Sequence, residues 1–152
     1  ENPPAPDGSQ RETAMMSDMI RIKQSRILQW LYYGGPVFAY AGLIFFLSSL
    51  SRFPEEVPSF FGFDKIAHFV EYYIFGWLLY RWFSSPDWVW GRRGVLLMTL
   101  LVGIGYAVGD EWHQSFVPGR DASFFDALFD AAGIASAAAT YPFIFMKVFG
   151  KQ

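Results

Sequence analysis

Four long apolar stretches dominate the 152-residue chain and restrict the folds that it can adopt. They run over about residues 27–50, 65–83, 93–111 and 126–148, and a helix needs about 20 residues to cross ~30 Å of hydrocarbon. Hydrophobic residues make up 53% of the chain and charged residues 17%, whereas about a quarter of a soluble domain is charged. Four such stretches in so short a chain disfavour buried helices of a soluble protein. We therefore predict one domain of the all-α membrane class, a bundle of four transmembrane helices.

The first 26 residues differ from the rest of the chain. They are polar, rich in Pro, Gly and Ser, and have no apolar stretch long enough for a secretory signal. We expect a polar cytoplasmic segment over residues 1–26 and the transmembrane domain over 27–150. The first residue is not methionine, so we expect the native start at Met15, Met16 or Met19 and residues 1 to about 18 outside the fold.

Two whole-chain properties exclude classes of function. The chain has no cysteine, which excludes disulfides and thiolate metal sites. Its net charge is −2 and no basic stripe is present, which argues against nucleic acid as a partner. The bilayer itself is the partner that the composition indicates.

The distribution of basic residues predicts the orientation. Positive charge concentrates in cytoplasmic segments, so the side with more Lys and Arg should be cytoplasmic. With four spans, both termini and the second connection share one side, and the first and third connections share the other. The first side has nine basic residues and the second has three: Arg11, Arg21, Lys23, Arg26, Arg81, Arg92, Arg93, Lys147 and Lys151 against Arg52, Lys65 and Arg120. We predict that both termini are cytoplasmic.

Two polar clusters interrupt the apolar chain. Residues 110–130 hold seven ionisable side chains between two apolar runs: Asp110, Glu111, His113, Arg120, Asp121, Asp126 and Asp130. Residues 64–71 hold four more: Asp64, Lys65, His68 and Glu71. Charge at membrane depth is costly and marks functional sites. The predicted topology brings both clusters to the extracytoplasmic face, where we expect one site.

The second predicted helix carries a polar stripe. At 100° per residue, one face spans roughly 60° of arc and contains Asp64, His68, Glu71 and Phe75, with Lys65 and Tyr72 at its edge. Glu71 lies about 10 Å below the helix start at 1.5 Å per residue, inside the apolar slab. The alternative to a ligand site is a buried Glu–Lys or Glu–His pair that joins helices.

The fourth predicted helix combines carboxylates with small residues. Asp126, Asp130, Gly133 and Ala137 recur at three- and four-residue spacing, and the small side chains favour close packing of another helix. Ser123 with Asp126 fits a capping box. Asp126 has an alternative role as a first-turn acid that complements the helix dipole.

The third predicted helix ends in polar residues and a turn. Asp110, His113 and Gln114 share a face, with Glu111 beside it; solvated helix-end charges are the alternative interpretation. Pro118-Gly119 predicts a type II turn, which presents Arg120 for bidentate capture of phosphate or carboxylate. Pairing of Arg120 with Asp121 or Asp110 is the structural alternative.

Two ligand classes fit this site. Helix N-termini with Lys65 and Arg120 favour an anion such as a lipid phosphate. The carboxylates with two histidines favour a divalent cation. No spacing matches a metal motif such as His-Glu-x-x-His, so we assign no metal ligand from the sequence, and the cofactor stays undefined. The sequence contains no phosphate-binding glycine loop. It also contains no Gly-x-Ser-x-Gly turn, which disfavours serine catalysis.

The polar residues form a long joint pattern. Asp64-Lys65-x-x-His68-x-x-x-Tyr72 is followed by Asp110-Glu111-x-x-Gln114-x-Phe116-x-Pro118-Gly119-Arg120-Asp121-x-Ser123-x-x-Asp126. This pattern resembles the VanZ-like family of bacterial integral membrane proteins, over roughly residues 30–148. Asp130 and Ala137 depart from the asparagine and glycine common in that family.

The resemblance implies an envelope protein of the bacterial cytoplasmic membrane, linked to resistance to the glycopeptide teicoplanin. We expect an extracytoplasmic pocket that binds an envelope lipid, a lipid-linked precursor or a lipoglycopeptide. The expected ligand-binding residues are Asp64, Lys65, His68, Glu71, Tyr72, Asp110, Glu111, Gln114, Arg120, Asp126 and Asp130. One alternative is a membrane-embedded, metal-assisted hydrolase or transferase acting on a lipid phosphate, with His68, Glu111 or Asp110 as catalytic candidates. Another is a structural or partner-binding bundle. The sequence leaves the oligomeric state undefined.

Overall fold

A computed structural model describes residues 8–50, 63–120 and 122–149 of the chain. Every regular element in these residues is an α-helix, which confirms the all-helical prediction. Five helices follow one another: α1 (Gly8–Tyr33), α2 (Gly35–Ser48), α3 (Phe63–Phe83), α4 (Arg92–Gln114) and α5 (Phe124–Phe149). Arg52, Asp121 and Lys151, which entered the expectations above, lie outside the described residues.

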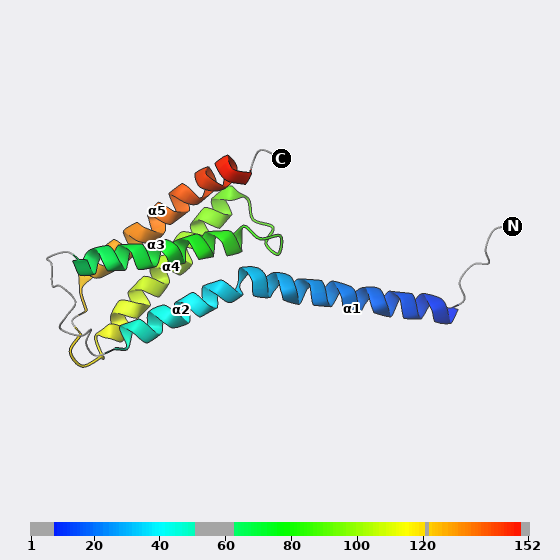
Figure 1. Cartoon of the computed structure of the whole chain (residues 1–152), viewed down its shortest axis with the longest axis horizontal. Coiled ribbons are helices and arrows are strands. Elements are labelled where there is room, and N and C mark those ends of the chain that lie inside the picture. Colours follow the sequence, from blue (N-terminus) through cyan, green and yellow to red (C-terminus); the bar gives the residue numbers. More distant parts are fainter. Residues whose placement is uncertain (1–7, 51–62, 121, 150–152) are drawn as a thin grey trace.

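The first predicted span corresponds to two helices. Helix α1 begins at Gly8 rather than near residue 27, and it projects away from the other helices in Figure 1. Gly34 separates α1 from α2, yet helical hydrogen bonding continues across it, from Gly34 N–H to Trp30 O at 2.7 Å and from Phe38 N–H to Gly34 O at 3.1 Å. Pro36 lies in the first turn of α2, a position at which proline, which has no N–H to donate, is tolerated.

The remaining helix bounds agree with the sequence to within three residues at each end. Within the described residues, three helical segments are long and apolar enough to cross a membrane: Met15–Ser48, Arg92–Gln114 and Phe124–Ile144. Helix α3 has 21 residues, about 31 Å at 1.5 Å per residue, but it is not among the three. Its polar residues, Asp64, Lys65, His68 and Glu71, lower its apolar character.

Small residues allow α3 and α5 to pack closely. A Cβ atom added at Gly133 would lie 2.5 Å from the carbonyl oxygen of Phe69, and one added at Gly76 would lie 2.8 Å from the Cβ of Ala137. The predicted close packing along the small residues of the fourth span is therefore confirmed. Helix α4 joins this pair through Gly103, where an added Cβ would lie 2.7 Å from Ile134.

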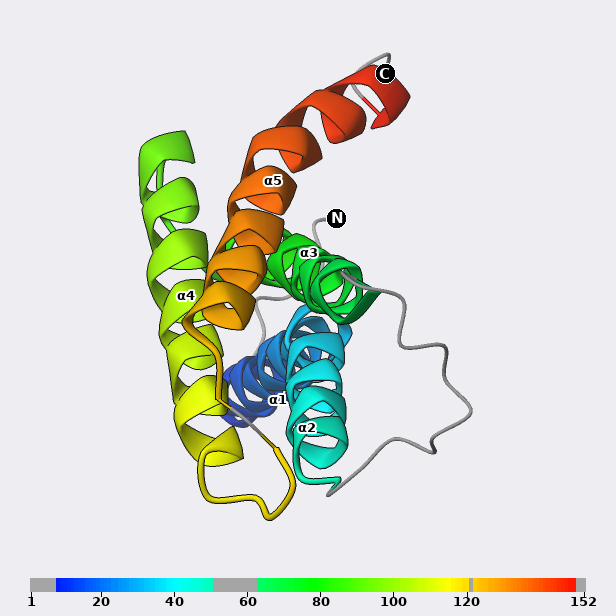
Figure 2. The same ribbon diagram turned by 90° about the vertical axis from the view of Figure 1, so that its left-hand side faces the viewer.

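The buried core lies between α3, α4 and α5. Tyr72, Phe75, Leu79 and Ile134 are almost completely buried. Figures 1 and 2 show that α2 and α4 end, and α3 and α5 begin, at the same end of the molecule. This arrangement brings the two polar clusters of the sequence together.

Candidate functional site

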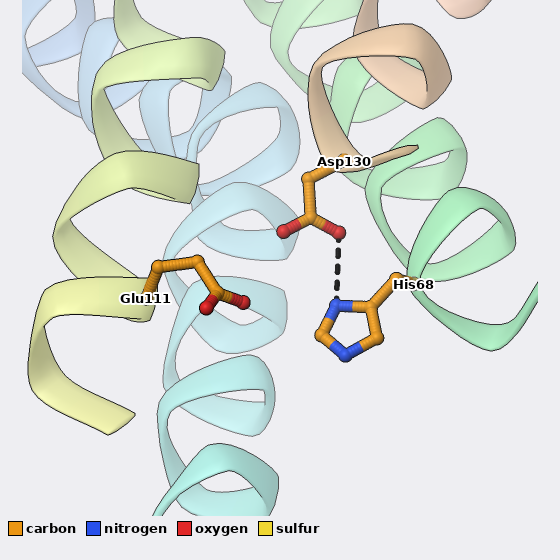
Figure 3. Close-up of side chains that lie close together, drawn as sticks. All are labelled: His68, Glu111 and Asp130. Atoms are coloured by element: carbon orange, nitrogen blue, oxygen red, sulfur yellow. Dashed lines mark hydrogen bonds and ion pairs between the residues drawn. The ribbon is translucent and has the colours of Figure 1, made fainter. Parts of the chain in front are cut away.

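The centre of the polar end is a contact between α3 and α5. His68 Nδ1 lies 3.0 Å from Asp130 Oδ1, although 62 residues separate them in the sequence. The Asp130 side chain has no exposed surface and that of His68 is 15% exposed. Figure 3 shows these two side chains pointing toward one another, with Glu111 of α4 facing them.

Glu111 connects α4 to the start of α5. Its Oε2 accepts a hydrogen bond from the Ser123 N–H at 2.9 Å. The predicted capping box places Asp126 in that role, so the prediction is wrong at this point. The reason is that a carboxylate from the neighbouring helix satisfies the Ser123 N–H, while Asp126 pairs with a lysine.

That lysine, Lys65, bridges two carboxylates. Its Nζ lies 2.9 Å from Asp126 Oδ1 and 3.2 Å from Asp64 Oδ2. Exposure falls along this trio from 61% for the Asp64 side chain to 32% for Lys65 and 14% for Asp126. The trio therefore leads from solvent toward the buried His68–Asp130 contact.

A second buried pair lies within α4. Gln114 Nε2 donates to Asp110 Oδ2 at 2.9 Å, a contact between residues four apart on one helix face. Both side chains are buried, which disfavours the alternative of solvated helix-end charges. Asp110 Oδ1 has no hydrogen-bond partner among the described residues.

The predicted turn before α5 is confirmed. Gly119 has a φ of 84°, and the Arg120 N–H donates to Val117 O at 3.1 Å, as expected for a type II turn with glycine at its third position. The Arg120 guanidinium donates to Leu47 O at 3.0 Å and to Leu50 O at 3.2 Å. These bonds satisfy carbonyls at the C-terminal end of α2 and connect the turn to that helix.

Glu71 and Tyr72 lie deeper on α3. Glu71 is half-buried and lies three residues, slightly less than one helical turn, beyond His68. Tyr72 is completely buried and packs against Phe75 and Tyr106, with ring centroids 6.2 and 6.5 Å away. The structure thus places Tyr72 in the aromatic core beneath the polar cluster.

Two contributions escaped the sequence reasoning. The Ser123 N–H orients Glu111, and a backbone donor leaves no signal in a side-chain pattern. The Tyr106 hydroxyl donates to Ala41 O at 2.7 Å and so joins α4 to α2, a contact that depends on the arrangement of the two helices.

The site is rich in hydrogen-bond acceptors. Besides Asp110 Oδ1, two buried carboxylate oxygens, Glu111 Oε1 and Asp130 Oδ2, have no partner in the described part of the chain. One ligand atom from each of His68, Glu111 and Asp130 lies within 4.8 Å of the other two. This set could hold a cation or accept hydrogen bonds from a polar ligand.

Comparison with known protein families supports the resemblance that the polar pattern indicates. The profile of a family described as VanZ/LLP1 matches residues 13–146, which includes α3, α4 and all but the last three residues of α5. Searches of curated proteins and of solved structures give no significant match. Since the family match covers most of the chain, the protein belongs to the VanZ/LLP1 family.

Proposed function

We propose that this protein crosses the bacterial cytoplasmic membrane four times, with α1 and α2 forming one span, and that it binds the polar group of a lipid-linked envelope ligand. Both termini would be cytoplasmic, and the polar site would face the envelope. The ligand would be an envelope lipid, a lipid-linked cell-wall precursor or a lipoglycopeptide. Binding there would contribute to glycopeptide resistance of the teicoplanin type, the role with which the VanZ family is linked.

The surface of α3 supports the proposal that this helix crosses the membrane in addition to the three apolar segments described above. Ile66, Val70 and Ile74 recur every four residues and are 60%, 48% and 41% exposed. His68 contacts Asp130 of α5 and Tyr72 packs against Tyr106 of α4, whereas this aliphatic stripe is exposed. Polar residues within a membrane span usually face the bundle interior. An exposed aliphatic stripe with a buried polar one suits a helix in contact with lipid.

The observation that carries the proposal is the set of buried acceptor oxygens beside a partly exposed lysine. Asp110, Glu111 and Asp130 each have an unpartnered carboxylate oxygen, and an unsatisfied buried polar atom is costly. A headgroup with hydroxyl, amide or ammonium donors would satisfy such oxygens. Lys65, 32% exposed and paired with Asp64 and Asp126, is the cation that an anionic part of the same headgroup would meet in place of one of these carboxylates. Glycan- and peptide-bearing envelope lipids combine these features.

Native mass spectrometry of the protein released from membranes in mild detergent tests the proposal. The parent should retain a lipid-linked adduct, and a Glu111→Gln, Lys65→Gln variant should lose it. Gly109→Ala is the matched control, since a Cβ there meets no atom within 4 Å. In a susceptible bacterial host, the parent should raise tolerance to teicoplanin more than tolerance to a glycopeptide without a lipid chain.

Two experimental outcomes would contradict the proposal. If parent and variant give the same bare spectra and the same tolerance at equal membrane abundance, the protein does not bind such a ligand at this site. If the variants instead lose abundance and no ligand is found, the polar residues serve to pair helices.

One observation favours a second function, a membrane-embedded hydrolase or transferase acting on a lipid phosphate. With Nδ1–H donated to Asp130, the other ring nitrogen of His68 would be unprotonated and able to accept a proton. Figure 3 shows that nitrogen pointing away from Asp130 and Glu111. Release of phosphate from a panel of lipid phosphates, abolished in His68→Gln, would support this function; absence of turnover in the parent would contradict it.

A further inference from the structure

Three side chains from three helices meet at one point. His68 of α3, Glu111 of α4 and Asp130 of α5 each place a potential metal-ligand atom within 4.8 Å of the other two. In Figure 3 the Nδ1 side of the His68 ring faces the two carboxylates. The three residues are far apart in the sequence, so no local sequence motif predicts that they lie together.

Each carboxylate has one oxygen engaged and one without a partner. Glu111 Oε2 accepts the Ser123 N–H at 2.9 Å, and Asp130 Oδ1 lies 3.0 Å from His68 Nδ1. Glu111 Oε1 and Asp130 Oδ2 are buried and have no partner among the residues described. Asp130 is 0% exposed and Glu111 8% exposed. A buried carboxylate oxygen needs a proton, a donor or a cation.

The basic side chains at this end of the bundle are engaged elsewhere. Lys65 pairs with Asp64 and Asp126, and Arg120 donates to the carbonyls of Leu47 and Leu50. Asp110, on the same helix as Glu111, adds a further buried carboxylate. Acidic groups therefore outnumber basic ones around the three side chains.

We propose that His68, Glu111 and Asp130 form a binding site for one divalent transition-metal ion, preferentially Zn²⁺. Imidazole nitrogen suits zinc and carboxylate oxygen suits both zinc and manganese, whereas magnesium and calcium prefer oxygen alone. Three protein ligands leave a coordination position for water or a ligand group, as in catalytic zinc sites. The Ser123 N–H, which donates to Glu111 Oε2, would orient Glu111 so that Oε1 is available as a ligand.

The observed spacing suits such a site after a small adjustment. Tetrahedral bonds of 2.0–2.2 Å place ligand atoms about 3.3–3.6 Å apart, a few tenths of an ångström more than the 3.0 Å between His68 Nδ1 and Asp130 Oδ1. The ion would replace the hydrogen shared by these atoms, so neutral His68 would carry its single N–H on Nε2 with no net proton release, whereas doubly protonated His68 would lose one proton. Glu111 has to approach, and its long side chain can do so by rotation.

Metal analysis of the purified protein tests this proposal without any lipid ligand. Metal-free protein should bind one Zn²⁺ per chain in a competition titration against a chromophoric chelator. Loss of a residue that only orients a ligand costs about 10–100-fold in affinity, so Glu111→Gln and Asp130→Asn should each cost at least about 100-fold. His113→Gln is the control for His68→Gln, since the His113 ring packs against Phe45 with centroids 4.5 Å apart.

A measurement on the parent protein tests the proposal even if a variant fails to fold. X-ray absorption at the zinc edge should show a shell of nitrogen and oxygen with the scattering of one imidazole. A shell without imidazole, affinity unchanged in the folded Glu111→Gln, Asp130→Asn double variant, or no stoichiometric Zn²⁺ or Mn²⁺ would overturn the proposal. With the ion on Glu111 and Asp130, a headgroup would bind through Asp110 Oδ1 and the open coordination position of the ion. Failure of the lipid-adduct experiment alone would leave the metal site standing, so the two proposals fail separately.

Discussion

Replacing Gly133 with alanine should destabilise the protein through backbone contact. The new Cβ would lie 2.5 Å from Phe69 O and 2.9 Å from Tyr73 N, both backbone atoms of α3. An ordinary van der Waals contact begins at 3.4 Å. Because neither atom belongs to a side chain that can rotate away, α3 and α5 have to separate locally by about 0.9 Å, the difference between 2.5 and 3.4 Å.

The size of the effect follows from packing. Overfilling a well-packed interior costs typically about 1–3 kcal/mol. For a chain of this size, 1 kcal/mol corresponds to roughly 2–4 °C in the midpoint of thermal unfolding. Relative to glycine-to-alanine variants at open positions, which share the same gain in helix propensity, we therefore expect Gly133→Ala to lower the midpoint by about 2–12 °C. Alanine has a higher helix propensity than glycine by about 1 kcal/mol, which partly offsets this loss when the parent is the reference.

The assay is the fraction of monodisperse protein in mild detergent after heating, measured by size-exclusion chromatography. Gly105→Ala and Gly109→Ala on α4 provide matched controls, since an added Cβ at either position meets nothing within 4 Å. Their midpoints should equal or slightly exceed that of the parent. A Gly133→Ala midpoint that equals those of the controls would refute the close contact between α3 and α5.

Three further predictions concern the contacts around the site. Tyr106→Phe removes the hydrogen bond to Ala41 O and should cost about 0.5–1.5 kcal/mol, seen as a lower thermal midpoint with α-helical circular dichroism retained; an unchanged midpoint would contradict it. Arg120→Met should speed amide hydrogen exchange at the C-terminal end of α2, because Leu47 O and Leu50 O lose their donor; unchanged exchange would argue against this anchor. Lys65→Met should lower thermal stability less in high salt than in low salt, since salt screens the partly exposed pair with Asp126; a loss independent of salt would point to packing instead.

The sequence predicted the all-helical class and most helix bounds well because long apolar stretches of this length favour helices. Four stretches of suitable length gave the bounds of three helices to within three residues. The first stretch was less accurate: α1 extends from Gly8, through a polar segment whose composition alone does not reveal helix. Residues of sufficient helix propensity can form a helix without any hydrophobic periodicity, so a polar sequence need not reveal the helix.

The polar site was predicted in outline, and its pairings were not. The sequence assigned His68 and Asp130 to one site, but their direct contact depends on the register between α3 and α5. Likewise, Ser123 and Asp126 satisfy the local capping pattern, yet Glu111 supplies the acceptor. Local patterns describe what a residue can do, and the packing of helices decides which available partner reaches it.

Small residues and polar residues on α5 are linked by that packing. Gly133 lies one turn beyond Asp130, and Phe69, whose carbonyl it approaches, follows His68 directly. The His68–Asp130 distance is 3.0 Å, and a separation of the helices by about 0.9 Å would carry these atoms beyond ordinary hydrogen-bond length. The glycine that permits close packing therefore also sets the distance between two ligand atoms of the site. A larger residue at 133 should weaken ion binding even if the protein remains folded, because the ligands would still be present but too far apart.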